Sequence, residues 1–109
     1  MRAPVTTHIL DLVRGRPAAG VAVQLFAGNE LVSEGVTNDD GRVEDWQQAF
    51  TLAPGKYRLE FAVEPWFAER GETSFYEDVH ISFRVAAVDE HYHVPLLLSP
   101  FGYSTYRGS

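Results

Sequence analysis

The spacing of turn signals is the feature that most constrains what this chain can fold into. Glycine, proline and Asn-Asp clusters recur so often along the 109 residues that only short elements fit between them. In two of the intervening runs, residues 57–63 and 79–85, apolar side chains occupy every second position. This alternation is typical of a strand with one buried face, so the chain is predicted to be mainly β.

We expect eight strands and one short helix. The expected strands are residues 7–13, 21–26, 30–37, 43–46, 57–63, 79–85, 92–99 and 103–107. The helix is expected at residues 64–71, because Pro65 can start it and Gly71 can stop it. Many short strands with frequent turns indicate an all-β, antiparallel sandwich or barrel. The length fits one domain, residues 1–109.

Composition excludes several classes of function. The net charge of −6 without a basic cluster argues against nucleic acid or an anionic membrane as a partner. The chain has no cysteine, so it has neither disulfides nor thiolate zinc sites. No apolar run approaches the ~20 residues of a membrane span, and neither end carries a recognisable signal or peroxisomal address. We therefore expect a cytoplasmic protein.

The run at residues 94–98 is apolar on both parities, which is unusual for a strand near the surface of a small sandwich. One face should meet the core, and we expect the other to meet a second subunit, although the monomer itself could cover it. Pro95 is unexpected in a central strand. It predicts either a bulge or a backbone position whose nitrogen does not join the ladder.

Histidines are the first candidates for chemistry, because they titrate near neutral pH. His80 lies on the outward parity of its strand, and a solvated side chain is the expected interpretation. His91 and His93 are two residues apart and so share one strand face, while His8 shares its face with leucines. A histidine among apolar neighbours is more often structural than catalytic, so position alone assigns no role.

Two chemical hypotheses compete for these residues. His8, His91 and His93 could be the three ligands of a catalytic zinc ion. Alternatively, a neutral histidine could deprotonate water without metal, with Arg42 or Arg107 holding an anionic substrate. The spacing leaves both open, and neither a Gly-x-Ser-x-Gly elbow nor a phosphate-binding glycine loop is present.

Both ends of the chain resemble the transthyretin-like family. Residues 7–11, THILD, and residues 14–20, RGRPAAG, resemble its N-terminal signature, and residues 91–109 resemble its C-terminal one. The ending Tyr-Arg-Gly-Ser at residues 106–109 resembles the hydrolase branch, and the hormone carrier lacks it. The resemblance spans nearly the whole chain, although residues 44–87 match in the pattern of strands and turns more than in residue identity.

The resemblance implies an eight-stranded transthyretin-like β-sandwich with one short helix, assembled as a homotetramer around a central channel. It implies hydrolysis of 5-hydroxyisourate to 2-oxo-4-hydroxy-4-carboxy-5-ureidoimidazoline in urate breakdown, part of purine metabolism, without metal or cofactor. The residues that it assigns to the site are the catalytic His8, Arg42 and His93 and the substrate-binding Tyr106, Arg107, Gly108 and Ser109. Which histidine is the general base stays open. The alternative is a non-enzymatic carrier of small ligands in the same channel.

Overall fold

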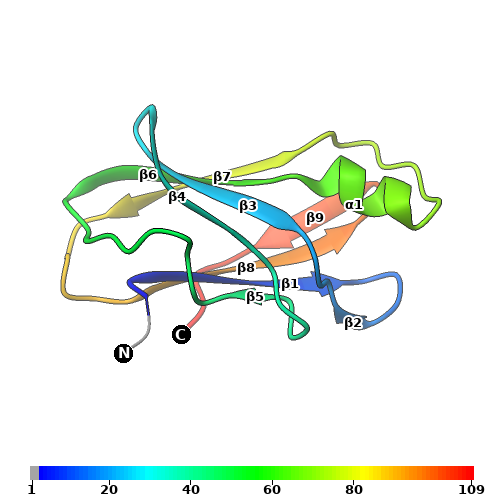
Figure 1. Cartoon of the computed structure of the whole chain (residues 1–109), viewed down its shortest axis with the longest axis horizontal. Helices are drawn as coiled ribbons and strands as arrows, with labels where there is room; N and C mark the ends of the chain where they lie inside the picture. Colours follow the sequence, from blue (N-terminus) through cyan, green and yellow to red (C-terminus); the bar gives the residue numbers. More distant parts are fainter. Residues whose placement is uncertain (1–2) are drawn as a thin grey trace.

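Two β-sheets packed face to face form the molecule (Figure 1), and this computed structural model describes residues 3–109. The first sheet contains β1 (Val5–Asp11), β2 (Arg16–Pro17), β5 (Arg42–Val43), β8 (Tyr92–Ser99) and β9 (Gly102–Thr105). The second contains β3 (Ala22–Ala27), β4 (Glu30–Val36), β6 (Gly55–Phe61) and β7 (Val79–Val85). The strand order is β2-β1-β8-β9 in the first sheet, with β5 also paired to β1, and β4-β3-β6-β7 in the second.

The core lies between the sheets because each strand turns alternate side chains inward. On β1 and β8, Ile9, Leu96 and Leu98 are fully or almost fully buried. His8 and Leu97, on the opposite parity, are only partly buried. Burying an aliphatic side chain of this size contributes about 1.5–3 kcal/mol. The inner face of the first sheet therefore stabilises the fold, and its outer face is left for another role.

Helix α1 (Val63–Glu69) lies at one end of the sandwich (Figure 1). It begins two residues before Pro65 and ends ahead of Gly71, whose φ of 71° is in the left-handed region that favours glycine. Trp66 is buried, and its indole N–H donates to the Ala19 carbonyl at 2.8 Å. The predicted helix is thus confirmed, with shifted bounds. Within residues 3–109 no helix is long and apolar enough to cross a membrane.

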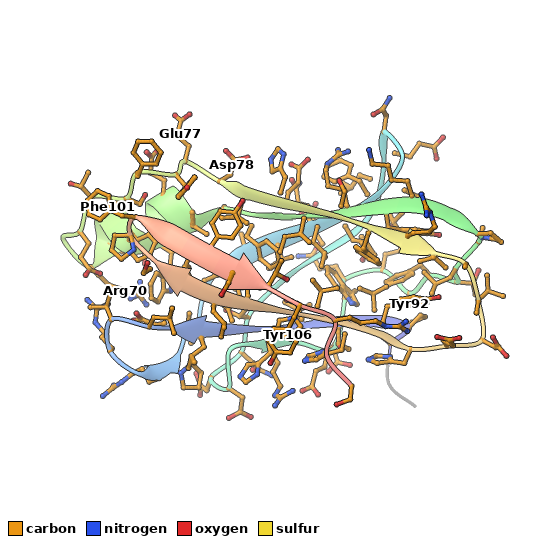
Figure 2. The ribbon with its side chains drawn as sticks, turned by 180° about the vertical axis from the view of Figure 1, so that it is seen from behind. Arg70, Glu77, Asp78, Tyr92, Phe101 and Tyr106 are labelled. Atoms are coloured by element: carbon orange, nitrogen blue, oxygen red, sulfur yellow. The ribbon has the colours of Figure 1, made fainter. Side chains whose placement is uncertain are left out.

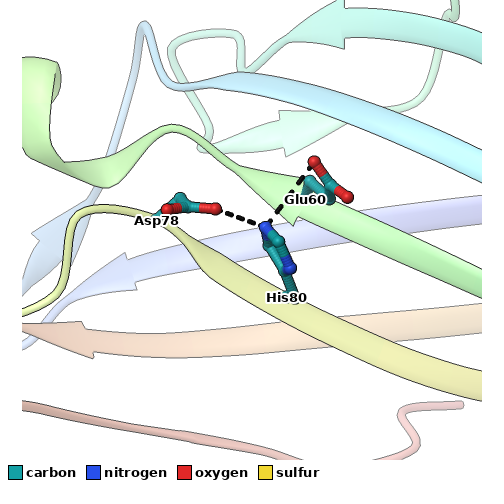
Figure 3. A group of neighbouring side chains, drawn as sticks. All are labelled: Glu60, Asp78 and His80. Carbon is teal, nitrogen blue, oxygen red and sulfur yellow. Dashed lines mark ion pairs between the residues drawn. The ribbon is translucent and has the colours of Figure 1, made fainter.

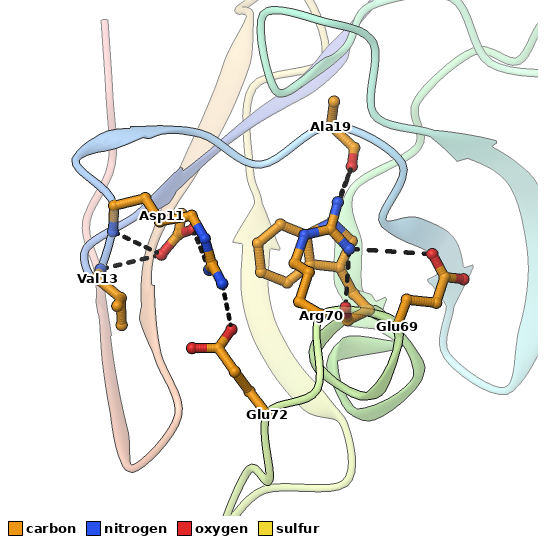
Figure 4. Close-up of polar contacts among 8 residues, drawn as sticks. Asp11, Val13, Ala19, Glu69, Arg70 and Glu72 are labelled. Carbon is orange, nitrogen blue, oxygen red and sulfur yellow. Dashed lines mark hydrogen bonds and ion pairs between the residues drawn. The ribbon is translucent and has the colours of Figure 1, made fainter.

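A buried carboxylate ties the end of β1 to the segment after the helix (Figure 4). Asp11 is only 1% exposed and accepts from the Val13 N–H at 2.9 Å and from the Arg14 guanidinium at 3.0 Å. Arg14 also donates to Glu72 at 2.9 Å. The buried charge is therefore both hydrogen-bonded and paired, which such a group requires.

The predicted fold class is confirmed, but two details differ from the expectation. Residues 3–109 form nine strands instead of eight, because Arg16–Pro17, where the sequence predicts a break, pairs with the end of β1 as β2. In addition, β1 pairs with β8 in parallel, whereas the other pairs are antiparallel. This parallel pair joins the two ends of the chain, so local sequence patterns contain no sign of it.

Pro95 lies in the middle of β8, at a gap in the ladder. On one side of β8 the Leu98 carbonyl accepts from the Leu12 N–H, and on the other the His93 carbonyl accepts from the Gly108 N–H, both at 2.9 Å. Successive residues point their backbone groups to opposite sides, so Pro95 shares the side of His93. On that side, β9 pairs with residues 96–99 of β8, and the next pairing is the single bridge between His93 and Gly108. Pro95 lies between the two. The missing N–H therefore interrupts no ladder bond.

Candidate active site

The outer face of the first sheet brings together the three predicted catalytic residues. The register sets His8 opposite both Arg42 on β5 and Pro95 on β8. Thr6 lies opposite His93 in the same parallel pair. Cross-strand partners point to one face of a sheet, and so do residues two apart on a strand. His8, Arg42 and His93 therefore share this face, with the two histidines one strand and two residues apart.

A tight turn delivers Arg42 to its place beside β1. The Asn38 side-chain oxygen accepts from the backbone N–H groups of Asp40 and Arg42, each at 3.0 Å. Gly41 has a φ of 72°, and its carbonyl accepts from the Ile9 N–H at 2.8 Å. A Cβ atom on Gly41 would lie 2.6 Å from the Ile9 carbonyl oxygen. Only glycine fits there, so this turn fixes the approach of Arg42 to the site.

The surroundings of His8 keep its ring neutral. Partial burial is the largest cause that lowers the pKa of His8 below 6.5, and the positive charge of Arg42 is the second. A hydrogen bond to the Asp40 backbone and the charges of Asp40 and Glu44 act in the opposite direction without reversing the shift. At neutral pH the site therefore combines an unprotonated imidazole with a fixed cation, which suits proton abstraction near an anion.

The C-terminal segment reaches the site through Gly108. A Cβ atom on Gly108 would lie 2.5 Å from Cδ2 of the His93 ring, so only a glycine can lie against that edge. Arg107 donates to Glu90 at 3.0 Å and stacks over the Tyr92 ring at 4.6 Å, and it also lines a cavity beside His93. In this chain Arg107 thus anchors the segment, and Gly108 makes the contact with the predicted catalytic histidine.

A cavity of about 350 Å³ lies beside His93, between β7 and the C-terminal segment. Tyr92 and Tyr106 are among the residues that line it, and Figure 2 labels both side chains. Tyr106 remains 58% exposed, and Ser109 is exposed as well. Arg42 lines a separate hollow of about 130 Å³. A single chain therefore assembles the residues of the outer face but divides the predicted site between two depressions.

Thr6 belongs to this site, although nothing in its local sequence marks it. Its side chain is 5% exposed, and its hydroxyl oxygen lies 2.8 Å from Nδ1 of His93 and 2.9 Å from Nε2 of His91. The contact depends on the parallel pairing of β1 with β8, which places Thr6 opposite His93. Only knowledge of that register would have identified the threonine.

The three histidines of the zinc hypothesis do not form a ligand cluster within residues 3–109 of one chain. The one such group described there lies on the second sheet and consists of Glu60, Asp78 and His80 (Figure 3). His80 forms ion pairs with Asp78 and, at 3.6 Å, with Glu60, which also accepts from Arg58 at 2.7 Å. Since His80 is 48% exposed, surface ion pairing accounts for this group.

The fold and the site together define a class of protein: a two-sheet β-sandwich that carries histidines and an arginine on the outer face of one sheet. The chain belongs to the HIUase/Transthyretin family, whose model matches residues 5–108, and the predicted family is thus confirmed. It is 43% identical over 121 residues to the 5-hydroxyisourate hydrolase of Halalkalibacterium halodurans, with 100% of both chains covered.

Solved structures on both sides of the family share this fold. The Klebsiella pneumoniae 5-hydroxyisourate hydrolase superposes with a TM-score of 0.87 at 40% identity, covering 96% of this chain and 98% of that one. Sea bream transthyretin in complex with thyroxine gives a TM-score of 0.88 at 30% identity, covering 97% and 95%. The fold alone therefore does not separate enzyme from carrier, and the site residues must do so.

Proposed function

We propose that this chain hydrolyses 5-hydroxyisourate to 2-oxo-4-hydroxy-4-carboxy-5-ureidoimidazoline. The observation that carries the proposal is the placement of His8, Arg42 and His93 on one sheet face, with Gly108 against the His93 ring. Family membership and the 40–43% identity to hydrolases such as those named above support it. A place in urate breakdown and a cytoplasmic location stay predictions from the sequence.

The chemistry requires a base, a stabilised oxyanion and a returned proton. Water loses a proton to a neutral histidine, its oxygen bonds to the ring carbonyl carbon, and negative charge develops on the carbonyl oxygen. The ring C–N bond then breaks, and the nitrogen leaves with a proton. We assign the proton transfers to His93 and His8, which share one sheet face, and the charge of the substrate and oxyanion to Arg42, which lies opposite His8. Oxidation states do not change, so the reaction needs no redox cofactor.

We further propose that the enzyme works as a homotetramer whose channel is lined by the outer face of the first sheet. Pro95 and Leu97 give this face an apolar centre, and Leu12 and Val13 beyond it are about half exposed. Sedimentation at micromolar concentration should show a species four times the 12.2 kDa chain. A monomer under these conditions would leave the divided site without a second wall and contradict the proposal.

The carrier alternative rests on the cavity beside His93, whose lining is mostly apolar. The two functions differ in one measurement, the disappearance of freshly prepared 5-hydroxyisourate followed by its absorbance. An enzyme accelerates the decay far above the buffer rate, and a carrier binds the compound without accelerating it. The same assay after exhaustive chelation tests the zinc hypothesis, since metal-free hydrolysis persists.

A further inference from the structure

The Thr6 hydroxyl lies between two imidazole rings. Its oxygen is 2.8 Å from Nδ1 of His93 and 2.9 Å from Nε2 of His91, and the side chain is buried. The two rings lie nearly parallel, with centroids 6.5 Å apart. Both distances are those of hydrogen bonds, so the three side chains form one continuous chain of donors and acceptors.

A hydroxyl has one proton and two acceptor lone pairs, so it can donate to only one of these nitrogens. When it does so, the other ring nitrogen donates to it, and two arrangements of neutral rings result. In one, His93 Nδ1–H donates to Thr6, and Thr6 donates to Nε2 of His91. In the other, every bond is reversed, and His93 carries its proton on Nε2. The tautomers of His91 and His93 are therefore coupled through Thr6.

Of these two arrangements, only the first is compatible with His93 acting as a base through Nε2. With the proton on Nδ1, the lone pair of the neutral ring is on Nε2. When Nε2 takes a proton from water, the ring becomes a cation that still donates from Nδ1 to Thr6, so no hydrogen bond breaks. In the reversed arrangement Nε2 already carries a proton and cannot accept another.

The ring is also held from its other side. Gly108 lies against the Cγ–Cδ2 edge of His93, where a Cβ atom would approach Cδ2 to 2.5 Å. The Gly108 N–H donates to the backbone carbonyl of the same histidine at 2.9 Å. Thr6 therefore faces the Nδ1 side of the ring and Gly108 the Cδ2 side, and together they restrict its rotation.

We propose that Thr6 is a positioning residue that holds His93 in the tautomer with Nδ1 protonated, and that Nε2 of His91 accepts the hydrogen bond that the Thr6 hydroxyl donates. This inference rests on the proposed hydrolase function and makes His93 the general base. A base held in the wrong tautomer loses most of its catalytic effect even when its geometry is intact.

The tautomer can be measured directly in the wild-type protein. Nitrogen-15 NMR of the imidazole rings, with His93 assigned from His93→Gln, should show Nδ1 protonated and Nε2 unprotonated while the ring is neutral. This readout does not depend on turnover. If the wild type fails to hydrolyse 5-hydroxyisourate, the proposed function is wrong; if His93 carries its proton on Nε2, the tautomer proposal is wrong.

Thr6→Val removes the hydroxyl while keeping the volume of the side chain. We expect kcat to fall about 10- to 100-fold with little change in KM, together with a mixed tautomer population at His93. Thr6→Ser should restore both the rate and the tautomer. Thr7→Val is the matched control, because Thr7 is also buried but its hydroxyl donates to the Val94 carbonyl at 2.6 Å. This control should lower the melting temperature and leave the His93 tautomer unchanged.

Two outcomes would overturn the proposal. One is a Thr6→Val protein with the wild-type tautomer, whatever its rate, because Thr6 would then act only through packing. The other is a Thr6→Ser protein as slow as Thr6→Val, since the hydroxyl would then not be the active group. If Thr6→Val does not fold, Thr6→Ser and His91→Phe replace it, and His91→Phe should shift the His93 tautomer population.

Discussion

Both sheets carry a histidine on the outer face, but the charged neighbours differ in sign: they are carboxylates on the second sheet and an arginine on the first. On the second sheet, His80 has the carboxylates of Asp78 and Glu60 as ion-pair partners. On the first, His8 lies opposite Arg42, and burial together with this cation lowers its pKa. Burial and a nearby cation favour the neutral ring that a base needs. Cross-strand neighbours, more than strand parity, thus distinguish a surface ion pair from a candidate base.

The largest expected effect is the difference in turnover between histidine variants on the first sheet and those on the second. His93→Ala should reduce turnover of 5-hydroxyisourate by about 10²–10⁴-fold, the usual contribution of a general base. His91→Ala should be milder, because its ring contacts Thr6 and acts on the reaction only through His93. His80→Ala, on the other sheet, is the control and should keep the wild-type rate. Comparable losses for His80→Ala and His93→Ala would remove the distinction between the faces.

Deleting residues 106–109 should impair catalysis far more than folding. The deletion removes Gly108 from the His93 ring and the Arg107 contacts with Glu90 and Tyr92, but no residue of the hydrophobic core. Misplacing a catalytic group by about 1 Å can cost about 100-fold in rate, so we expect a loss of at least this size. The melting temperature and the tetramer should change little.

Two results would count against this interpretation of the C-terminal segment. A truncated protein as fast as the full chain would place the site away from the segment. A truncated protein that dissociates into monomers would make the segment an assembly element, and the loss of activity would then say nothing about His93. Measuring turnover, mass and melting temperature on one preparation separates these cases.

Much of the fold could be predicted from the sequence because alternation is a local signal. The alternating runs at residues 57–63 and 79–85 correspond to β6 and β7, and the apolar run at residues 94–98 lies in β8. The nitrogen of Pro95 lies outside the ladder, which was one of its two predicted explanations. Strand ends were less accurate, because pairing partners set them.

The site was less predictable because it depends on register between distant segments. Residues His8 and His93 share a face only through the parallel pair of β1 and β8, and the resemblance suggested them before the geometry did. Thr6 was missed for the same reason. The placement of Arg107 over Tyr92 was also not predictable, since a cation near a chain end has many possible partners. The assigned roles of these residues stay predictions until the variants are measured.

The two sheets also offer a comparison of their turns. Gly41, beside the site, and Gly28, in the β3–β4 hairpin, both have positive φ, at 72° and 59°. Alanine in this region costs about 1–2 kcal/mol. Gly41→Ala should cost more, because its Cβ would lie 2.6 Å from the Ile9 carbonyl oxygen, whereas the Cβ of Gly28→Ala meets nothing within 4 Å among residues 3–109. Denaturant unfolding of both variants tests this, and equal losses would mean that the turn before Arg42 is not tightly packed.

The smallest expected effect is a change in the pKa of His8, and it tests whether the charge of Arg42 helps to keep this histidine neutral. Arg42→Gln removes the second cause of the low pKa of His8, so that pKa should rise toward 6.5, while partial burial continues to oppose the rise. Because the folded state of the wild type favours neutral His8, this group contributes stability above pH ~6.5 that is lost as the pH falls through its folded pKa. The acid-side loss of stability should therefore be smaller in Arg42→Gln. Proton NMR titration of the histidine ring signals measures the shift directly, and His80 on the other sheet is the internal control that should not move. If the pKa of His8 stayed unchanged or fell, its neutrality would come from burial alone, and the cross-strand arginine would have no part in preparing the base.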